Sequence, residues 1–452
     1  MTETDNQDNQ NFSMEGTQSG KPPSHLWYIC FLLANVSSGL MTPLMPLFVY
    51  NYLHSSIFYY GVTSAIASLA SSFALIIWGN LSDSVGKRKI FVLIAFFGSF
   101  LSLSLIFFVG TLLEYIITIV LFQIFSMASV PVSTLMVIEN SPESQWSRTV
   151  SVFSAISSIG TVAGLVFGLI IVETNISDPQ ILRLIYLVSA FIYLAAFVGS
   201  MVLLKEPSSK VRRRQLSWLY SVRTTEKPSF HPLYVLHVIK FFRKKKESFK
   251  PILKYYFVVC LILMFAFQLF FIPYPVFMLQ QYGASETVIY VMYLVNSIFS
   301  TVSFNYASAY IRRASLEKSL YAPVLIRVIA FSVAASFPLL NIQDPWGMLI
   351  ALMIYGSIGT FWSIINITQI TIISSIAKKV NRGRAIGYYN SILGVGQIAA
   401  GIVSGTVLLL TSYTVDFSLA AIMAIFGLFL FARKKEFRNI SKLKDEPSLV
   451  NF

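Results

Sequence analysis

A short charged segment in the first fifth of the chain combines an acid, two glycines and a run of cations. It begins at Gly79 and reads GNLSDSVGKRK. Gly79 would let a helix approach its neighbour closely, and Gly86 permits a turn that other residues adopt only at a cost. Asp83 can cap a helix N-terminus or bind a cation, while Lys87 and Arg88 can bind anionic lipid headgroups. The chemistry predicted here is reversible charge pairing, with no covalent bond made or broken.

Other residue types that carry chemistry are sparse. The two cysteines, Cys30 and Cys260, lie in apolar runs, and none of the four histidines falls in the interior of such a run. The sequence contains neither a phosphate-binding glycine loop nor a cluster with metal-ligand spacing. We therefore expect no catalytic residue, no metal and no cofactor, and the sequence predicts a protein that is not an enzyme.

Neutral amides inside the apolar runs are the candidates for contacts with a solute. An amide in lipid costs free energy unless it faces protein, water or a ligand. The predicted cavity residues are Asn35, Gln123, Gln268, Asn296, Asn366 and Gln397. For any one of them, a hydrogen bond that only joins two helices is at least an equal explanation. Amides and aromatic rings without a charge favour an uncharged or weakly charged solute.

Glycines recur on one face of the fifth apolar run. Gly160, Gly164 and Gly168 are four residues apart, which places them on one side of a helix and permits close backbone contact. The eleventh run repeats the feature with Gly387 and Gly396. We expect two glycine-rich helices at an interface between two halves, with ordinary small-residue packing as an equal alternative.

The elements that must position these residues are membrane spans. The chain has 452 residues, of which 55% are hydrophobic and 12% charged, whereas soluble proteins carry about 25% charged residues. Runs of about 20 apolar residues are long enough to cross a bilayer as helices. The predicted spans are 26–52, 60–80, 89–110, 114–138, 149–172, 182–204, 252–280, 287–311, 320–340, 346–376, 385–411 and 414–432. The fold class expected is therefore an all-α integral membrane protein.

One long basic segment divides the spans six and six. The predicted parts are a disordered tail 1–25, a six-helix bundle 26–204, a basic linker 205–250, a second bundle 251–432 and a tail 433–452. If the N-terminus is cytoplasmic, every Lys and Arg except Arg183 lies on the inner side, with Arg327 counted there as a residue two turns into its span. The net charge of +14 then reflects the orientation of the protein in the membrane, with its cations on the inner side. We expect these cations to contact anionic lipids of the inner leaflet, and we expect no nucleic-acid partner.

The two halves carry traces of a repeat. Cys30 and Pro43 in the first span correspond to Cys260 and Pro273 in the seventh, and Gly160 in the fifth corresponds to Gly396 in the eleventh. Paired six-helix halves are typical of transporters whose site lies between them. The prolines predict kinks in the first and seventh spans.

The charged segment resembles the loop signature of the major facilitator superfamily, G-x-L-[A/S]-D-x-x-G-[K/R]-[K/R], at every specified position. The resemblance implies two pseudo-symmetric six-helix bundles, with spans one, four, seven and ten around a cavity. It also implies a conformational latch, in which Asp83 engages the start of span eleven near Arg382 and Arg384 when the inner side is closed. Glu139 and Arg148 are the expected neighbours in this charge network.

The glycine face of span five resembles a degenerate form of the signature of drug-exporting members, with Ser151 at its first position and Leu165 in place of proline. Other elements of that branch are missing. Phe122 and Ser126 stand where drug and proton antiporters carry an arginine and a glycine, and no Asp or Glu lies in mid-span. Coupling to protons therefore stays open.

We expect a monomeric, multi-pass permease of the cell membrane, with both termini cytoplasmic, that moves a small organic solute by alternating access. The drug-export branch is the nearest pattern. A facilitator or importer of a sugar or other metabolite, without proton coupling, is one alternative. A transport-inactive sensor or scaffold that binds a partner through its linker is another.

Overall fold

The protein is described here by a computed structural model that covers residues 25–85, 87–140, 146–174, 180–206, 250–340, 345–377, 382–434 and 437. In these ranges the chain is helical, with no strand. The α-helices of the first half are α1 (Tyr28–Met41), α2 (Leu44–Leu47), α3 (Ile57–Val85), α4 (Lys89–Ile106), α5 (Leu112–Ser126), α6 (Val130–Glu139), α7 (Trp146–Thr174) and α8 (Ile181–Leu203). Those of the second half are α11 (Pro251–Phe271), α12 (Tyr274–Tyr282), α13 (Glu286–Arg313), α14 (Leu316–Leu340), α15 (Pro345–Ile376), α16 (Arg382–Leu410) and α17 (Tyr413–Arg433).

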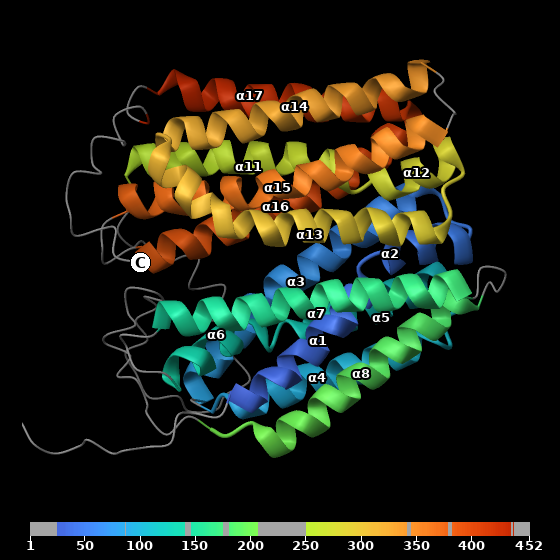
Figure 1. Cartoon of the computed structure of the whole chain (residues 1–452), viewed down its shortest axis with the longest axis vertical. Coiled ribbons are helices and arrows are strands. Elements are labelled where there is room, and N and C mark those ends of the chain that lie inside the picture. Colours follow the sequence, from blue (N-terminus) through green and yellow to red (C-terminus); the bar gives the residue numbers. More distant parts are fainter. Residues whose placement is uncertain are drawn as a thin grey trace, which may run out of the picture.

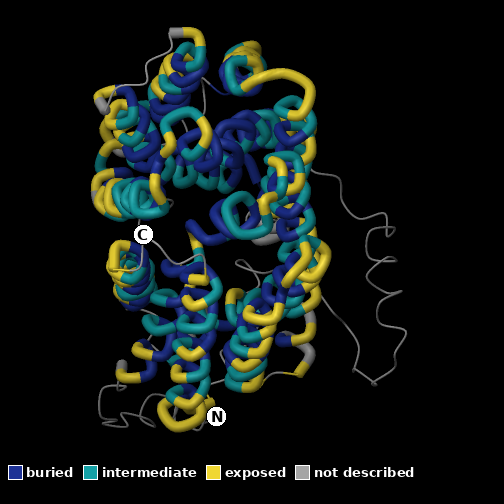
Figure 2. The backbone as a smooth tube through the Cα atoms, turned by 90° about the vertical axis from the view of Figure 1, so that its right-hand side faces the viewer, coloured by how far each residue is buried: buried dark blue, intermediate teal, exposed yellow. Residues whose placement is uncertain are grey.

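The helices form 12 segments that are long and apolar enough to cross a membrane. Three of these segments consist of successive helices: α1, α2 and a π-helix over Phe48–Tyr52 form the first, α5 with α6 the fourth, and α11 with α12 the seventh. Large apolar side chains such as Phe108 and Val202 are exposed on the outer surface, as lipid contact requires. Figure 2 shows the exposed residues along the outside of the helices. The prediction of an all-α, multi-pass membrane protein is confirmed.

Prolines account for the breaks in the first and seventh segments. Pro43 separates α1 from α2, and Pro273 separates α11 from α12. Proline lacks the N–H that continues a helix, and its ring clashes with the preceding turn. The break between α5 and α6 was not predicted, and Pro131 in the first turn of α6 accounts for it.

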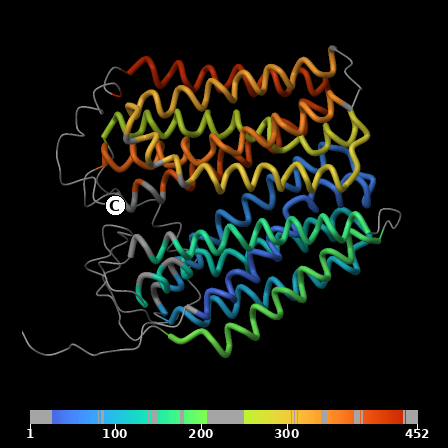
Figure 3. The backbone as a smooth tube through the Cα atoms, in the orientation of Figure 1, coloured from blue at the N-terminus to red at the C-terminus, as the bar shows by residue number. Residues whose placement is uncertain are grey.

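The helices form two groups that lie side by side, α1 to α8 and α11 to α17 (Figures 1 and 3). Within the first group α1 packs against α7 and α8, and within the second α11 packs against α16 and α17. Each group has a buried aromatic centre, for example Tyr115 and Tyr186, whose hydroxyl groups are hydrogen-bonded at 2.7 Å. Residues 207–249 of the predicted linker, and the tails apart from a few residues, lie outside the described ranges, so the domain boundaries stay predictions.

The most extensive contacts between the two groups are those of α3 with α16 and of α7 with α13, and α2 also contacts α12. We call the end of the molecule where α8 ends and α11 begins the linker end, and the opposite end the distal end. In Figure 1 the linker end is on the left, and α2 and α12 lie near each other at the distal end. These two ends differ in how the groups meet.

Candidate functional site

The charged segment lies at the linker end, and more of it is helical than a loop signature implies. Helix α3 continues to Val85, so Gly79 and Asp83 belong to its last turns and the connection to α4 is very short. The close approach expected at Gly79 is absent, because a Cβ built there meets no atom within 4 Å. Gly86 and the side chain of Asp83 lie outside the described residues.

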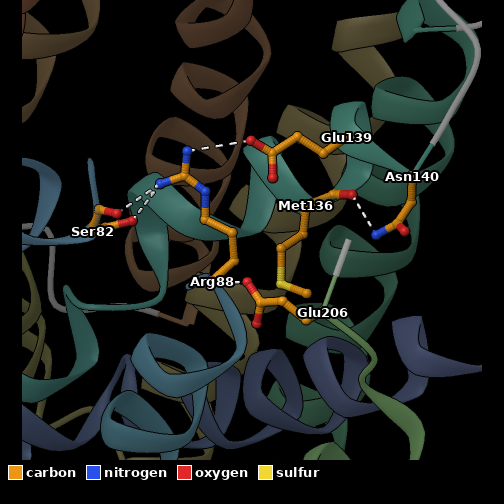
Figure 4. Close-up of polar contacts among 6 residues, drawn as sticks. All are labelled: Ser82, Arg88, Met136, Glu139, Asn140 and Glu206. Atoms are coloured by element: carbon orange, nitrogen blue, oxygen red, sulfur yellow. Dashed lines mark hydrogen bonds and ion pairs between the residues drawn. The ribbon is translucent and has the colours of Figure 1, made fainter. Parts of the chain in front are cut away.

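Arg88 is the centre of the charge network at this end (Figure 4). Its guanidinium is buried and donates hydrogen bonds to the Ser82 hydroxyl at 2.7 Å and to the Ser82 carbonyl at 3.2 Å. It also forms an ion pair with Glu139 at 3.3 Å, which joins α4 to α6. A buried arginine requires such partners, since an unpaired charge inside a protein is costly. Lys87, by contrast, is exposed.

The expected partners of this network are only partly described. Glu139 pairs with Arg88 of its own half, and the side chain of Arg148, in the first turn of α7, lies outside the described residues. The same is true of Arg382 and Arg384 in the first turn of α16. The latch between Asp83 and the start of α16 therefore stays a prediction.

Glu206 was not among the predicted residues. Its carboxylate accepts a hydrogen bond from the backbone N–H of Arg88 and another, at 3.0 Å, from that of Lys89. Both donors belong to the N-terminus of α4, where a negative charge is favourable. Figure 4 shows Glu206 beside Arg88. The end of α8 is thereby attached to the charged segment. Glu206 is the first acid after the sixth apolar run, but its partner is 118 residues away, which the sequence does not reveal.

Replacing Glu206 with alanine should lower the free energy of unfolding by about 1 kcal/mol, the usual contribution of a helix cap. The thermal midpoint of the purified protein measures this. Glu206→Gln keeps one acceptor oxygen and should fall between alanine and wild type. Equal midpoints for all three proteins would contradict the capping role.

At the distal end, side chains join the two halves. The Asn51 amide donates to a Glu286 carboxylate oxygen at 2.9 Å, and the Tyr290 hydroxyl donates to the Leu40 carbonyl at 2.8 Å. Both bonds cross from the first half to the second. Tyr290 is fully buried at this contact. The halves are therefore closed against each other at the distal end.

Glycines make the same closure possible between α3 and α16. A Cβ at Gly61 would clash with the Gly401 carbonyl, and a Cβ at Gly401 would meet the Gly61 carbonyl at 2.8 Å. Nearer the middle of both helices, Gly394 lies against the Ser72 hydroxyl. A Cβ at Gly79, nearer the linker end, meets no atom within 4 Å, so the close contact between α3 and α16 at Gly61 is not repeated at that residue.

The glycines of the predicted face pack against two different parts of the molecule. Gly160 and Gly164 pack against α1 of their own half, where a Cβ at Gly160 would meet the Leu32 carbonyl at 2.7 Å. Gly168 faces the ring of Tyr290 in the other half. Gly396 packs against α11, the counterpart of α1, and the surroundings of Gly387 are not described. Gly168 therefore lies at a contact between the halves, whereas Gly160, Gly164 and Gly396 pack against helices of their own half.

The six amides fall into two groups. Asn35 donates to the Phe31 carbonyl of its own helix at 2.7 Å, and Asn296 donates to the Tyr355 carbonyl of α15 at 2.7 Å. The others have half-buried side chains without a hydrogen-bond partner in the described part of the chain. They are Gln123, Gln268, Asn366 and Gln397. A free amide on a half-buried face is available to a solute, and all six contacts with substrate stay predictions.

Arg327 corrects the assignment of cations to one side. Helix α14 begins at Leu316, so Arg327 lies about 16 Å along a helix of 25 residues, near its middle. Its side chain is 1% exposed. Arg327 is therefore an ionisable residue in mid-span. The apolar residues that flank it in the sequence were the signal that could have identified it.

The described residues form twelve membrane-length helices in two halves that meet at the distal end. The chain belongs to the major facilitator superfamily, whose family model matches residues 27–379 and 323–450, and this membership makes it a membrane transporter and not an enzyme. This confirms the superfamily but not its drug-export branch.

Solved structures of transporters share the fold. The nucleoside transporter NupG has a TM-score of 0.69 at 14% identity, covering 90% of this chain and 98% of that chain. A POT family transporter in complex with 5-aminolevulinic acid has a TM-score of 0.71 at 12% identity, with coverages of 91% and 96%. A bacterial homologue of the human lysosomal transporter Spinster, inward-facing and unoccupied, has a TM-score of 0.61 at 13% identity, with coverages of 93% and 97%. At these identities the likeness shows the fold alone. A comparison with curated protein sequences finds no match.

Proposed function

We propose that the protein moves a small organic solute across the membrane by alternating access between its two halves. The observation that carries the proposal is the unequal contact between halves, which are joined by Asn51, Glu286 and Tyr290 at the distal end, whereas no atom lies within 4 Å of a Cβ at Gly79 toward the linker end. A solute site between the halves would then be open toward the linker end. The free amides of Gln123, Gln268 and Asn366, on spans four, seven and ten, are its proposed contacts.

We propose that the linker end faces the cytoplasm of the cell membrane, with both termini on that side. The support is the charge distribution, because cations concentrate in the linker and in the joints that share its end. The basic linker would contact anionic lipids of the inner leaflet, and the protein would act as a monomer.

The latch is part of this proposal. In the state that is open distally, Asp83 would pair with the start of α16 and close the linker end. Asp83→Asn should then favour the linker-open state and raise the labelling of cysteines placed at that end by an impermeant thiol reagent. Transport and labelling identical to wild type would contradict the latch.

Export coupled to protons is the first form of this function that we propose, because the glycine face resembles that of drug exporters. Its proton carrier would be Asp416, which is fully buried. One of its carboxylate oxygens accepts from the Ser404 hydroxyl at 3.0 Å, and the other has no hydrogen-bond partner among the described residues. The end-placed acid Glu114 is instead occupied by a capping box with Thr111.

An uncoupled facilitator is the second candidate. Glu139 is paired with Arg88 and so is not free to carry a proton, and Asp416 lies in the first turn of α17, away from mid-span. Substrate counterflow and proton flux in proteoliposomes separate the two. Coupled export predicts proton movement with substrate, and its loss in Asp416→Asn while counterflow continues. A facilitator predicts counterflow without proton movement in both proteins. A protein that catalyses no counterflow of any solute would be a sensor or scaffold.

A further inference from the structure

A single arginine is buried in the middle of the second half. Arg327 of α14 lies among aromatic rings of two neighbouring helices. Its guanidinium carbon is 4.3 Å from the ring centre of Phe267 and 5.4 Å from that of Phe271, both on α11. On α15, the ring of Trp362 is 5.6 Å away. The cation is therefore enclosed by rings and removed from both ends of the span.

Most of the hydrogen-bonding capacity of Arg327 is unused. Nη2 donates to the Ile358 carbonyl at 3.3 Å, whereas Nε and Nη1 have no partner in the described part of the chain. No acid of the described residues pairs with it, in contrast to Arg88 and its partner Glu139. Four of its five N–H groups have no acceptor, and its positive charge has no counter-ion, among the described residues.

The fold gains little stability from this arrangement. Burying an ion costs several kcal/mol even after relaxation, and the three ring contacts, at about 2 kcal/mol each when desolvated, only offset that cost. An apolar residue of similar length would fill the same space without the cost of burying a charge. An ionisable residue kept inside a membrane span without a gain in stability indicates a role in function.

The surroundings of Arg327 connect it to the proposed solute site. The helices that carry its rings, α11 and α15, also carry two of the free amides. Gln268 is within one turn of Phe271, and Asn366 is one turn from Trp362. All four side chains are half-buried. A rearrangement of the Phe271 and Trp362 rings would bring the guanidinium into contact with whatever occupies the space beside these amides.

We propose that Arg327 binds the carboxylate of an organic monoanion, whose apolar or aromatic body lies against Phe271 and Trp362. The inference rests on the proposed transport function and names its substrate class. A guanidinium matches a carboxylate with two parallel hydrogen bonds, and the pair is strong where water is excluded. A bound carboxylate would supply the negative charge and the hydrogen-bond acceptors that Arg327 lacks among the described residues.

The charge environment selects a monoanion over a phosphate dianion. The other cations of the described second half lie in the first or last turns of their helices, far from the middle of α14. One buried arginine neutralises one negative charge. The proposal thereby departs from the expectation of an uncharged or weakly charged solute, which the amides and aromatic residues alone had favoured.

Binding to the purified full-length protein in nanodiscs tests the proposal. The probes are benzoate with its neutral amide benzamide, and hexanoate with hexanamide, titrated by calorimetry up to millimolar concentrations. At least one carboxylate should bind at least about tenfold more tightly than its amide, as expected for a charge-assisted pair. Equal binding of acid and amide, or no binding of either acid, would overturn the proposal.

Three variants separate recognition from a structural role. Arg327→Met should abolish the preference for the acid and, because it removes an unpaired buried charge, raise the thermal midpoint. Arg327→Lys should keep the preference in part. Arg183→Met is the matched control: Arg183 lies 4.5 Å from the ring of Tyr52 and is hydrogen-bonded to the Val109 carbonyl, so its loss should lower the midpoint and leave binding unchanged.

A lower midpoint for Arg327→Met with the preference for the acid intact would show that Arg327 is structural, and would overturn the proposal. Two further outcomes distinguish failure of the anion site from failure of the proposed transport function. Binding that depends on Arg327 without any counterflow supports the anion site while contradicting transport. Counterflow of a neutral solute that is identical in Arg327→Met supports transport while contradicting the anion site.

Discussion

Replacing Gly164 with alanine is expected to lower the free energy of unfolding by about 3 kcal/mol, at the upper end of the usual cost of overpacking a tight core. A Cβ at this position would clash with the Val36 carbonyl, which is backbone and cannot move aside. The contact is close from both sides, because a Cβ at Gly39 would likewise clash with the Thr161 carbonyl. Helices α1 and α7 would have to separate, and a lower thermal midpoint of the purified protein measures the loss.

Gly79→Ala is the matched control for Gly164→Ala. Nothing lies within 4 Å of a Cβ at Gly79, and alanine favours a helix over glycine by about 0.5–1 kcal/mol. The control should therefore unfold at the wild-type midpoint or slightly above it. Equal midpoints for both variants would show that α1 and α7 are not held by backbone contact.

Replacing Gly61 with alanine should shift the protein from the distally closed state to a distally open one. The new Cβ would clash with the Gly401 carbonyl across the two halves. The halves can relieve this clash by separating, without unfolding. A cost of about 2 kcal/mol to one state changes the ratio of the two populations roughly thirtyfold.

A cysteine in place of Leu40 reports this shift, since Leu40 is fully buried and its carbonyl accepts the Tyr290 hydroxyl across the interface. Its reaction with an impermeant maleimide should be faster in Gly61→Ala than in the parent protein. The native cysteines are both buried. Gly79→Ala, on the same helix, adds no clash in the distally closed state and should not raise the rate. An unchanged rate in Gly61→Ala would mean that the distal contact does not control access.

The spans and their two-half arrangement could be predicted because they depend on local composition. Hydropathy over about 20 residues determines which segments enter the bilayer, and Pro43 and Pro273 mark breaks by their own chemistry. The same rule applied to Pro131 would have located the break between α5 and α6. The helical state of Asp83 was missed, because the second span was ended at residue 80 and a signature known as a loop does not fix where a helix ends.

The pairing of side chains could not be predicted, since it joins residues far apart in the chain. Asn51 and Glu286 are 235 residues apart, and nothing near either one indicates the other. Whether an amide such as Asn296 faces a solute or a neighbouring carbonyl depends on helix rotation, which periodicity leaves undetermined in an apolar span. Arg327 was assigned to a membrane surface because its span was started four residues too late, at 320 rather than at Leu316.

The most direct test of alternating access is a pair of distances between the halves, measured by electron spin resonance on doubly labelled protein in nanodiscs. Exposed positions Leu113 and Trp346 report the distal end, and Leu203 and Arg433 report the linker end. In Gly61→Ala, relative to the parent protein, the distal distance should lengthen while the linker-end distance shortens. Two distances that change in the same direction, or that both stay constant in a folded variant, would contradict transport by alternating access.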